Sequence, residues 1–176
     1  IVHQAVQLLG ADGGAVYRLN HEDEEISMVT AWGMPREFTA VGSFPLDLKA
    51  PVHRAVVQHR AFTVPDFARM APPRDFDEQP SSVRELSTTV QKHFRASLTV
   101  PLVVEDELYG AVTLYYRAPH AFSDEETNLS LSLADQAALA IENARLRVEA
   151  EKSAAAAERS RLARDLHDAV TQTLFS

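Results

Sequence analysis

Hydrophobic and polar positions alternate in two pairs of short runs, and a period of two is typical of strands that bury one face. The first pair is GAVYRL at 14–19 and EISMVTAW at 25–32, separated by the polar turn NHEDE. The second pair is RASLTVPLVV at 95–104 and LYGAVTLYY at 108–116, separated by the acidic turn EDE. Each pair predicts an antiparallel hairpin, and we expect the second to lie in the centre of the sheet.

Between the hairpins the pattern predicts a helix, a short strand and a loop. APVHRAVVQHR at 50–60 has apolar residues at helical spacing, and Pro51 suits a first helical turn. AFTVPDF at 61–67 resembles a short strand. Residues 68–91 hold three prolines and little periodicity. We expect a long loop there with room for a short helix, and loops of that length are usually functional or disordered.

A long helix is predicted to follow the second hairpin. All six glycines and all nine prolines lie at or before Pro119, so neither residue type interrupts the rest of the chain. Ser123 is a good N-cap, and three acidic residues in the next turn complement the positive end of a helix. A helix that continues to Ser176 is roughly 80 Å long. The roughly 120 residues before it form too small a domain to bury a helix of this length, so we expect a second chain to cover part of the helix.

Apolar repeats on this helix predict a parallel dimer seam. Leu139 and Leu146 are seven residues apart. Ile141 and Val148 have the same spacing. Small residues that allow close helix approach recur at Ala137, Ala140 and Ala144. For residues 125–140 the alternative is that the helix packs back on its own sheet, and a single helix can do both.

Composition narrows the class of protein. The chain has 45% hydrophobic and 24% charged residues, and no apolar run approaches the roughly 18 to 20 residues that cross a bilayer. It has no cysteine, which excludes disulfides and thiolate sites and fits a reducing cytoplasm. The net charge of −8 argues against nucleic acid as a partner. We therefore expect a cytoplasmic segment without membrane contact. Because it begins at Ile1 and ends within a pattern, we expect it to be a piece of a longer protein.

Two stretches resemble the GAF domain family of sensory modules. LTVPLVVEDELYGAVTLYYRAPHAFSDEE at 98–126 is similar to the stretch that ends most GAF domains, and LADQAALAIENARL at 133–146 is similar to the helix that follows it. The resemblance covers residues 1–148. It implies an α+β fold, with an antiparallel sheet flanked by helices and followed by a long C-terminal coiled-coil helix.

A GAF domain implies a possible small-molecule ligand, which we expect between the sheet and the segment 65–94. The candidate wall residues, each of which is an ordinary core residue in the alternative interpretation, are Phe67, Phe76, Phe94, Leu98 and Tyr115. His93 precedes the central strand, and some haem-binding GAF sensors use a histidine in this region. A hydrated loop histidine is the alternative. The residues assign no cofactor, and no two histidines have metal-ligand spacing on a shared face.

The end of the chain resembles the phosphoacceptor box of sensor histidine kinases that pair with LuxR/NarL-type response regulators. The matching residues are ERSRLARDLHDAVTQTL at 158–174. The resemblance implies a GAF sensory domain at 1–148, a helical linker at 149–157 and the N-terminal part of the dimerisation and phosphoacceptor helix at 158–176. It also implies a homodimer joined through the C-terminal helix and a LuxR/NarL-type regulator as partner.

Three residues of this box are the candidate catalytic residues. A neutral imidazole at His167 has a nitrogen nucleophile for the γ-phosphate of ATP. Asp168 can accept a hydrogen bond from the other ring nitrogen and stabilise the imidazolium that forms. Gln172 lies four residues after Asp168 and hence on the same face, where its amide can orient a water. In the family this acid-to-glutamine spacing is linked to removal of phosphate from the regulator.

Other interpretations stay open. His167 can be an interfacial histidine in a coiled coil whose arginines and aspartates form solvated pairs four residues apart. The whole chain can be a ligand-binding GAF dimerisation module whose helix is a tether without phosphotransfer. The kinase interpretation makes the parent protein an ATP-dependent protein-histidine kinase. This chain alone should be inactive, because ATP and magnesium would bind a catalytic domain outside its 176 residues.

Overall fold

The computed structural model divides the chain into two compact units, Ile1–Ala138 and Leu139–Ser176. The residues that it describes are 2–20, 22, 24–39, 43–45, 54, 55, 58, 60–70 and 80–174, with side chains as far as Leu162.

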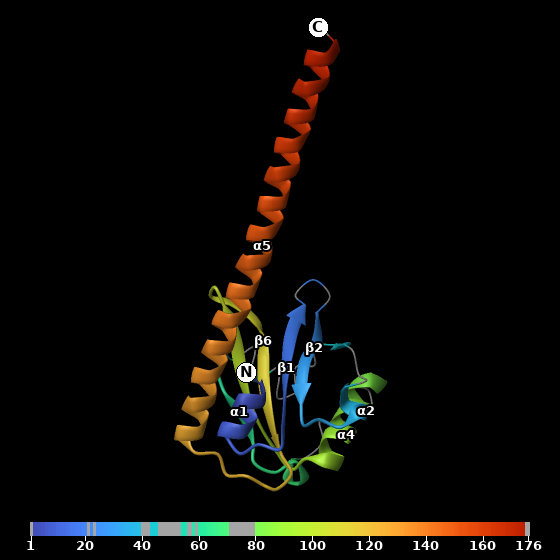
Figure 1. Ribbon diagram of the computed structural model, residues 1–176. Helices are drawn as coiled ribbons and strands as arrows, with labels where there is room; N and C mark the ends of the chain where they lie inside the picture. Colours follow the sequence, from blue (N-terminus) through green and yellow to red (C-terminus); the bar gives the residue numbers. More distant parts are fainter. Residues whose placement is uncertain are drawn as a thin grey trace. The chain divides into compact units, whose positions relative to one another are not determined.

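One antiparallel sheet organises the first unit (Figure 1). Among the described residues it has six strands in the order β3-β2-β1-β6-β5-β4. The strands are β1 (Gly13–Asn20), β2 (Glu25–Trp32), β3 (Ser43–Pro45), β4 (Phe62–Val64), β5 (Ala96–Val104) and β6 (Glu107–Tyr116). Both predicted hairpins are confirmed, and β6 and β5 are interior strands as expected.

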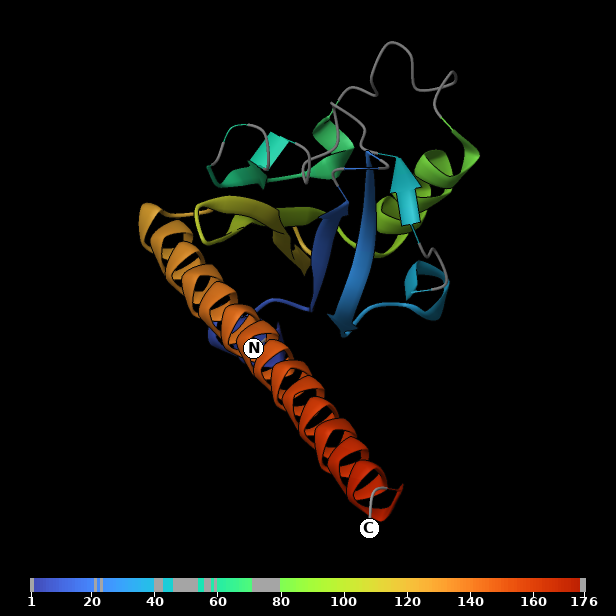
Figure 2. The ribbon, with the colours of Figure 1, turned by 90° about the horizontal axis from the view of Figure 1, so that it is seen from above.

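Helices lie on both faces of the sheet (Figures 1 and 2). The described helices are α1 (Val2–Leu8), α2 (Arg36–Thr39), the 3-10 helix η1 (Phe67–Arg69), α4 (Ser81–His93) and α5 (Asp124–Leu174). On one face, α1 and the start of α5 enclose a cavity of about 10 Å³, room for at most one water. On the other face, α4 packs its apolar side onto the sheet. The α+β fold with a long C-terminal helix is therefore as predicted.

The two central strands are buried on both faces, so their alternate residues belong to two different layers. Leu98 pairs with Leu114, and Leu114 lines the cavity beside α1. Ser97 pairs with Tyr115, whose ring belongs to the apolar cluster beneath α4. The sheet thus separates an α1 side from an α4 side.

The region between the hairpins differs from the prediction. The short strand at 61–67 is confirmed as β4, but residues 81–93 form a 13-residue helix where we expected mostly loop. Its N-cap is Pro80, which has no side-chain hydrogen bond to the helix, so the usual start signal was missing. The short elements α2 and β3 were not predicted. Most of the predicted helix at 50–60 lies outside the described residues.

Helix α5 begins after Ser123 and is continuous over 51 residues, as the absence of glycine and proline predicted. Its first part packs on its own sheet, because Ala134, Ala137 and Ala138 are buried within the first unit. Ala137 lies in the stretch for which a dimer seam and packing on the sheet were both open, and its burial within the first unit favours packing on the sheet. In the second unit the described apolar side chains of Leu146 and Leu162 are exposed.

Gly110 is predicted to be the glycine that the sheet tolerates losing least. A Cβ at this position would overlap the carbonyl oxygen of Tyr17 on the neighbouring strand. We expect Gly110→Ala to lower the free energy of unfolding by about 3 kcal/mol in urea denaturation. The control is Gly10→Ala, where φ is +62° but no atom lies within 4 Å, so we expect a loss of about 1 kcal/mol. Equal losses in the two variants would contradict this account of the strand contact.

Candidate functional site

The apolar cluster on the α4 side of the sheet surrounds a pair of buried tyrosines. The hydroxyls of Tyr17 on β1 and Tyr115 on β6 are 2.9 Å apart. The Tyr115 ring has its centroid 5.2 Å from that of Phe94 and meets Phe38 edge-on at 5.7 Å. The tyrosine pair is therefore a polar contact enclosed by aromatic rings, and it joins two neighbouring strands.

Burial keeps both tyrosine hydroxyls protonated. It raises the pKa of Tyr17 well above its ordinary value, and the neighbouring Tyr115 raises it further. Burial also raises the pKa of Tyr115 to about 12, although hydrogen bonds from Tyr17 and Thr113 act in the opposite direction. Since both groups are neutral at physiological pH, each hydroxyl can donate as well as accept a hydrogen bond.

Two buried polar atoms close to this cluster have no hydrogen-bond partner among the described residues: His93 Nε2 and Ser97 Oγ. Ser97 is 1% exposed, and its partner in the sheet is Tyr115, so its side chain belongs to the α4 side. His93 ends α4 and continues the helical spacing of Val83 and Val90, which face the sheet. The layer between α4 and the sheet thus contains unsatisfied hydrogen-bonding capacity.

The structure describes four of the five candidate wall residues, and these divide between the two layers of the domain. Phe67, Phe94 and Tyr115 belong to the α4-side cluster. Leu98 was wrong, because it pairs with Leu114 and lies on the α1 side of the sheet. Phe76 lies outside the described residues.

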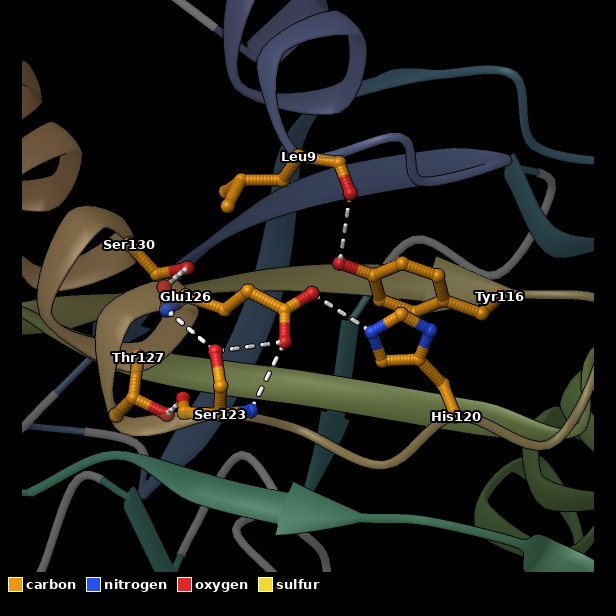
Figure 3. Close-up of polar contacts among 7 residues, drawn as sticks. All are labelled: Leu9, Tyr116, His120, Ser123, Glu126, Thr127 and Ser130. Atoms are coloured by element: carbon orange, nitrogen blue, oxygen red, sulfur yellow. Dashed lines mark hydrogen bonds and ion pairs between the residues drawn. The ribbon is translucent and has the colours of Figure 1, made fainter.

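A second polar site lies where β6 gives way to α5 (Figure 3). Ser123 and Glu126 form a reciprocal capping box at the start of the helix. The Glu126 amide donates to Ser123 Oγ at 3.1 Å, and Glu126 Oε2 accepts from the Ser123 amide at 2.9 Å. The Ser123 hydroxyl also donates to Glu126 Oε2 at 3.1 Å. These contacts satisfy polar groups that a helix N-terminus leaves without intrahelical partners.

His120 connects this cap to the sheet. Its Nε2 is 2.7 Å from Glu126 Oε1, and its ring stacks on Tyr116 with centroids 4.4 Å apart and an interplanar angle of 20°. Phe122 packs against both rings. The Tyr116 hydroxyl donates to the carbonyl of Leu9, the residue that follows α1, at 3.4 Å.

The charge on Glu126 determines which side chain donates the hydrogen bond between His120 and Glu126. Hydrogen bonds from the Ser123 backbone, and then from His120, hold the pKa of Glu126 below its ordinary value. An ionised carboxylate can only accept, so His120 Nε2 must carry the hydrogen. Ser123 was predicted as the N-cap and Glu126 as one of three acidic residues in the first turn, but neither the capping box nor the contact with His120 was predicted. The glutamate three residues after the serine was the available signal for Glu126.

The C-terminal part of α5 contains the predicted catalytic residues. His167, Asp168 and Gln172 all have helical backbone, but their side chains lie outside the described part of the structure. At the start of the segment 158–174, Arg161 forms two hydrogen bonds with Glu158, at 2.7 and 3.0 Å, on the exposed helix surface. This pair lowers the pKa of Glu158. It adds little to stability, because exposed ion pairs are screened by solvent.

Two further observations apply to the described residues alone. They contain no group of three or more histidine, aspartate or glutamate side chains placed to hold a metal ion. No helix that they form combines the length and the apolar character needed to cross a bilayer.

Comparison with known proteins identifies the two parts of the chain. The family model of the GAF domain matches residues 1–141, and a family model described as histidine kinase matches residues 158–176. The sensor histidine kinase YhcY of Bacillus subtilis (strain 168) is 41% identical over 78 residues. That alignment covers 44% of this chain and only 21% of YhcY.

Solved structures agree with this fold. A domain from Sinorhizobium meliloti 1021, described as part of a two-component sensor histidine kinase, has a TM-score of 0.64 at 19% identity, with 85% of this chain and 92% of that chain covered. The GAF domain of an Acinetobacter phosphoenolpyruvate-protein phosphotransferase has a TM-score of 0.63 at 15% identity. The match covers 82% of this chain and 80% of that chain. Identities this low establish the fold alone. Since the GAF model matches the first 141 of 176 residues, the chain belongs to the GAF domain family and continues into a histidine kinase segment.

Proposed function

We propose that this chain is the sensor-to-transmitter segment of a two-component histidine kinase. In this proposal the GAF domain senses a signal and controls ATP-dependent phosphorylation of His167 and phosphate transfer to a LuxR/NarL-type response regulator. The observation that carries it is the histidine kinase match at 158–176, which lies on the same continuous helix that begins in the GAF domain. Because ATP and such regulators are cytoplasmic, the proposal places the segment in the cytoplasm.

The chemistry needs one nucleophile and one acid-base partner. A neutral ring nitrogen of His167 attacks the γ-phosphorus of ATP, the bond to the bridging oxygen breaks, and ADP leaves. The proton on the other ring nitrogen is held by Asp168 as positive charge develops. Gln172 acts in a different reaction, the hydrolysis of the regulator's phosphate, by orienting a water toward that phosphate. In this proposal, ATP and magnesium bind a domain other than the two segments matched at 1–141 and 158–176.

The sensor side of the proposal rests on the layer between α4 and the sheet. Aromatic rings supply apolar contact there, and the buried atoms His93 Nε2 and Ser97 Oγ have no hydrogen-bond partner in the part of the chain that the structure describes. A small ligand that presents a hydrogen-bond donor and an acceptor would satisfy both atoms. Haem ligation by His93 is an alternative for the same atom, and an absorbance spectrum of the purified protein distinguishes the two.

Dimerisation through α5 is the third part of the proposal. In the second unit Leu139, Leu146 and Val148 are 61%, 52% and 49% exposed, which is costly for apolar side chains on an isolated helix. Leu139 and Leu146 lie on one stripe and Val148 on another, because two positions along a helix differ by about 200°. A partner helix that covers one stripe would remove that apolar surface from water.

The proposed catalytic roles predict three different kinetic outcomes in the longer kinase. His167→Gln abolishes autophosphorylation, because no neighbouring side chain supplies a nitrogen nucleophile. Asp168→Asn keeps the shape but removes the charge, so autophosphorylation falls by roughly 10²- to 10⁴-fold. Gln172→Ala leaves autophosphorylation largely intact and slows loss of phosphate from the regulator. Transfer from radiolabelled ATP measures all three.

Unaltered autophosphorylation in His167→Gln would leave the helix as a tether without phosphotransfer. Equal damage to both reactions in Gln172→Ala would show that this residue supports the helix instead of orienting water.

The unsatisfied hydroxyl of Ser97 predicts an unusual stability effect. Without ligand, Ser97→Ala removes a buried polar atom that none of the described residues bonds, so we expect the free energy of unfolding to rise by about 1 kcal/mol. The matched control is Thr99→Val, which breaks the 3.1 Å bond between the Thr99 and Thr113 hydroxyls and should cost about 1 to 3 kcal/mol. Urea denaturation of both variants is the measurement. Destabilisation by Ser97→Ala would mean that the hydroxyl is already satisfied, which removes the support for a ligand there.

The two apolar stripes on α5 predict which surface joins the protomers. Light scattering of the 176-residue chain at tens of micromolar should show a dimer. Leu146→Asp and Val148→Asp each place a charge on one stripe, and the variant that becomes monomeric identifies the seam. A wild-type monomer whose residues 150–174 stay helical, or two variants that both stay dimeric, would contradict an interface on this helix.

A further inference from the structure

Strand β6 ends in two adjacent tyrosines that face opposite layers of the domain. Tyr115 lies in the cluster beneath α4, where its hydroxyl meets that of Tyr17. Tyr116 points to the other side, toward the carbonyl of Leu9 and the ring of His120 (Figure 3). Because the two residues share one peptide bond, Tyr115 cannot shift along or across the sheet without displacing Tyr116.

The backbone around these tyrosines is held on both sides, which limits where a displacement can go. The Tyr115 carbonyl accepts from the Asp12 amide at 2.9 Å, and the Tyr116 carbonyl accepts from the Arg95 amide at 2.7 Å. The Arg117 amide donates to Asp12 Oδ2 at 2.7 Å. These bonds make residues 115–117 move together with Asp12 and Arg95, and the Tyr116 side chain carries such a movement toward His120.

His120 connects the Tyr116 side chain to the first turn of α5. Its amide donates to the carbonyl of Pro65, directly after β4, at 3.0 Å, so the loop cannot move independently of the sheet. Its ring is fixed between Tyr116 and Phe122, and its Nε2 bonds the carboxylate of Glu126. That carboxylate is itself part of the cap that begins α5.

We propose that Tyr116, His120 and Glu126 form a linkage that couples the α4-side cluster to the first turn of α5. A change around Tyr115 then alters the stability of the helix N-terminus through these three side chains. His120 is the central positioning residue, because it is the member that contacts both the strand and the helix cap. The inference deepens the proposed function, since α5 is the helix that continues to His167.

The linkage can be tested in the 176-residue chain by amide hydrogen exchange, without ATP or an identified ligand. Tyr17→Phe removes the hydroxyl that bonds Tyr115, and Tyr17 belongs to the cluster on the α4 side of the sheet. We expect exchange of the amides of Thr127–Ser130 to accelerate by roughly 5-fold, beyond the change in β2 that reports global destabilisation. Repeating Tyr17→Phe in a His120→Ala background should give no additional acceleration at these amides.

Two further variants separate the linkage from a general loss of packing. Tyr116→Phe keeps the ring that stacks on His120 and loses only the 3.4 Å bond to Leu9, so the effect of Tyr17→Phe should persist. His120→Gln keeps a side-chain N–H but lacks the ring, so it should abolish the effect, and it replaces His120→Ala if that variant fails to fold.

The proposal is overturned if Tyr17→Phe accelerates exchange equally with and without His120, or if it leaves Thr127–Ser130 unchanged in the wild-type background. These outcomes do not depend on phosphorylation. A linkage that fails here leaves the roles of His167 open, and a failed kinase assay leaves the linkage open.

Discussion

Burial of strand β6 on both faces is the constraint on which the rest of the domain depends. A strand in this position must be apolar at nearly every residue, and its neighbours must approach closely on both edges. Gly110 allows the close approach to Tyr17, and Tyr115 and Tyr116 place large rings in both layers. The α1 side and the α4 side are therefore not independent cores, since the same strand supplies side chains to each.

The strands were predictable because their apolar patterns are strong and local. The hairpins at 14–32 and 95–116 have short polar turns, so pairing follows from the sequence alone. Helix α4 was harder to predict, because Pro80 gives no side-chain cap and only three of the thirteen helix residues, Val83, Leu86 and Val90, are apolar. The sequence also could not predict on which side of the sheet Leu98 lies. Strand β5 is apolar on both faces, so its pattern does not indicate which residues face α1 and which face α4.

The two candidate sites differ in what the sequence could reveal. The histidine kinase match at 158–176 is contiguous in the sequence, so roles for His167, Asp168 and Gln172 could be proposed from a resemblance along one stretch of chain. The linkage at His120 depends on a ring from β6 and a carboxylate from α5, and neither partner is implied by the histidine's own neighbours. Likewise, Ser97 resembles any strand serine until the structure shows that none of the described residues bonds its hydroxyl. Sites built from several elements need the fold before they can be recognised.

The uninterrupted backbone of α5 has a consequence for how such proteins can be assembled by recombination. Each residue added to or deleted from the helix between the two family matches rotates everything beyond it by about 100°. Seven residues restore the original phase to within about 20°. Natural or engineered fusions of this GAF domain to another output module should therefore tolerate length changes in heptad steps and fail at intermediate lengths, so that helical phase, more than linker length or composition, governs which combinations transmit a signal.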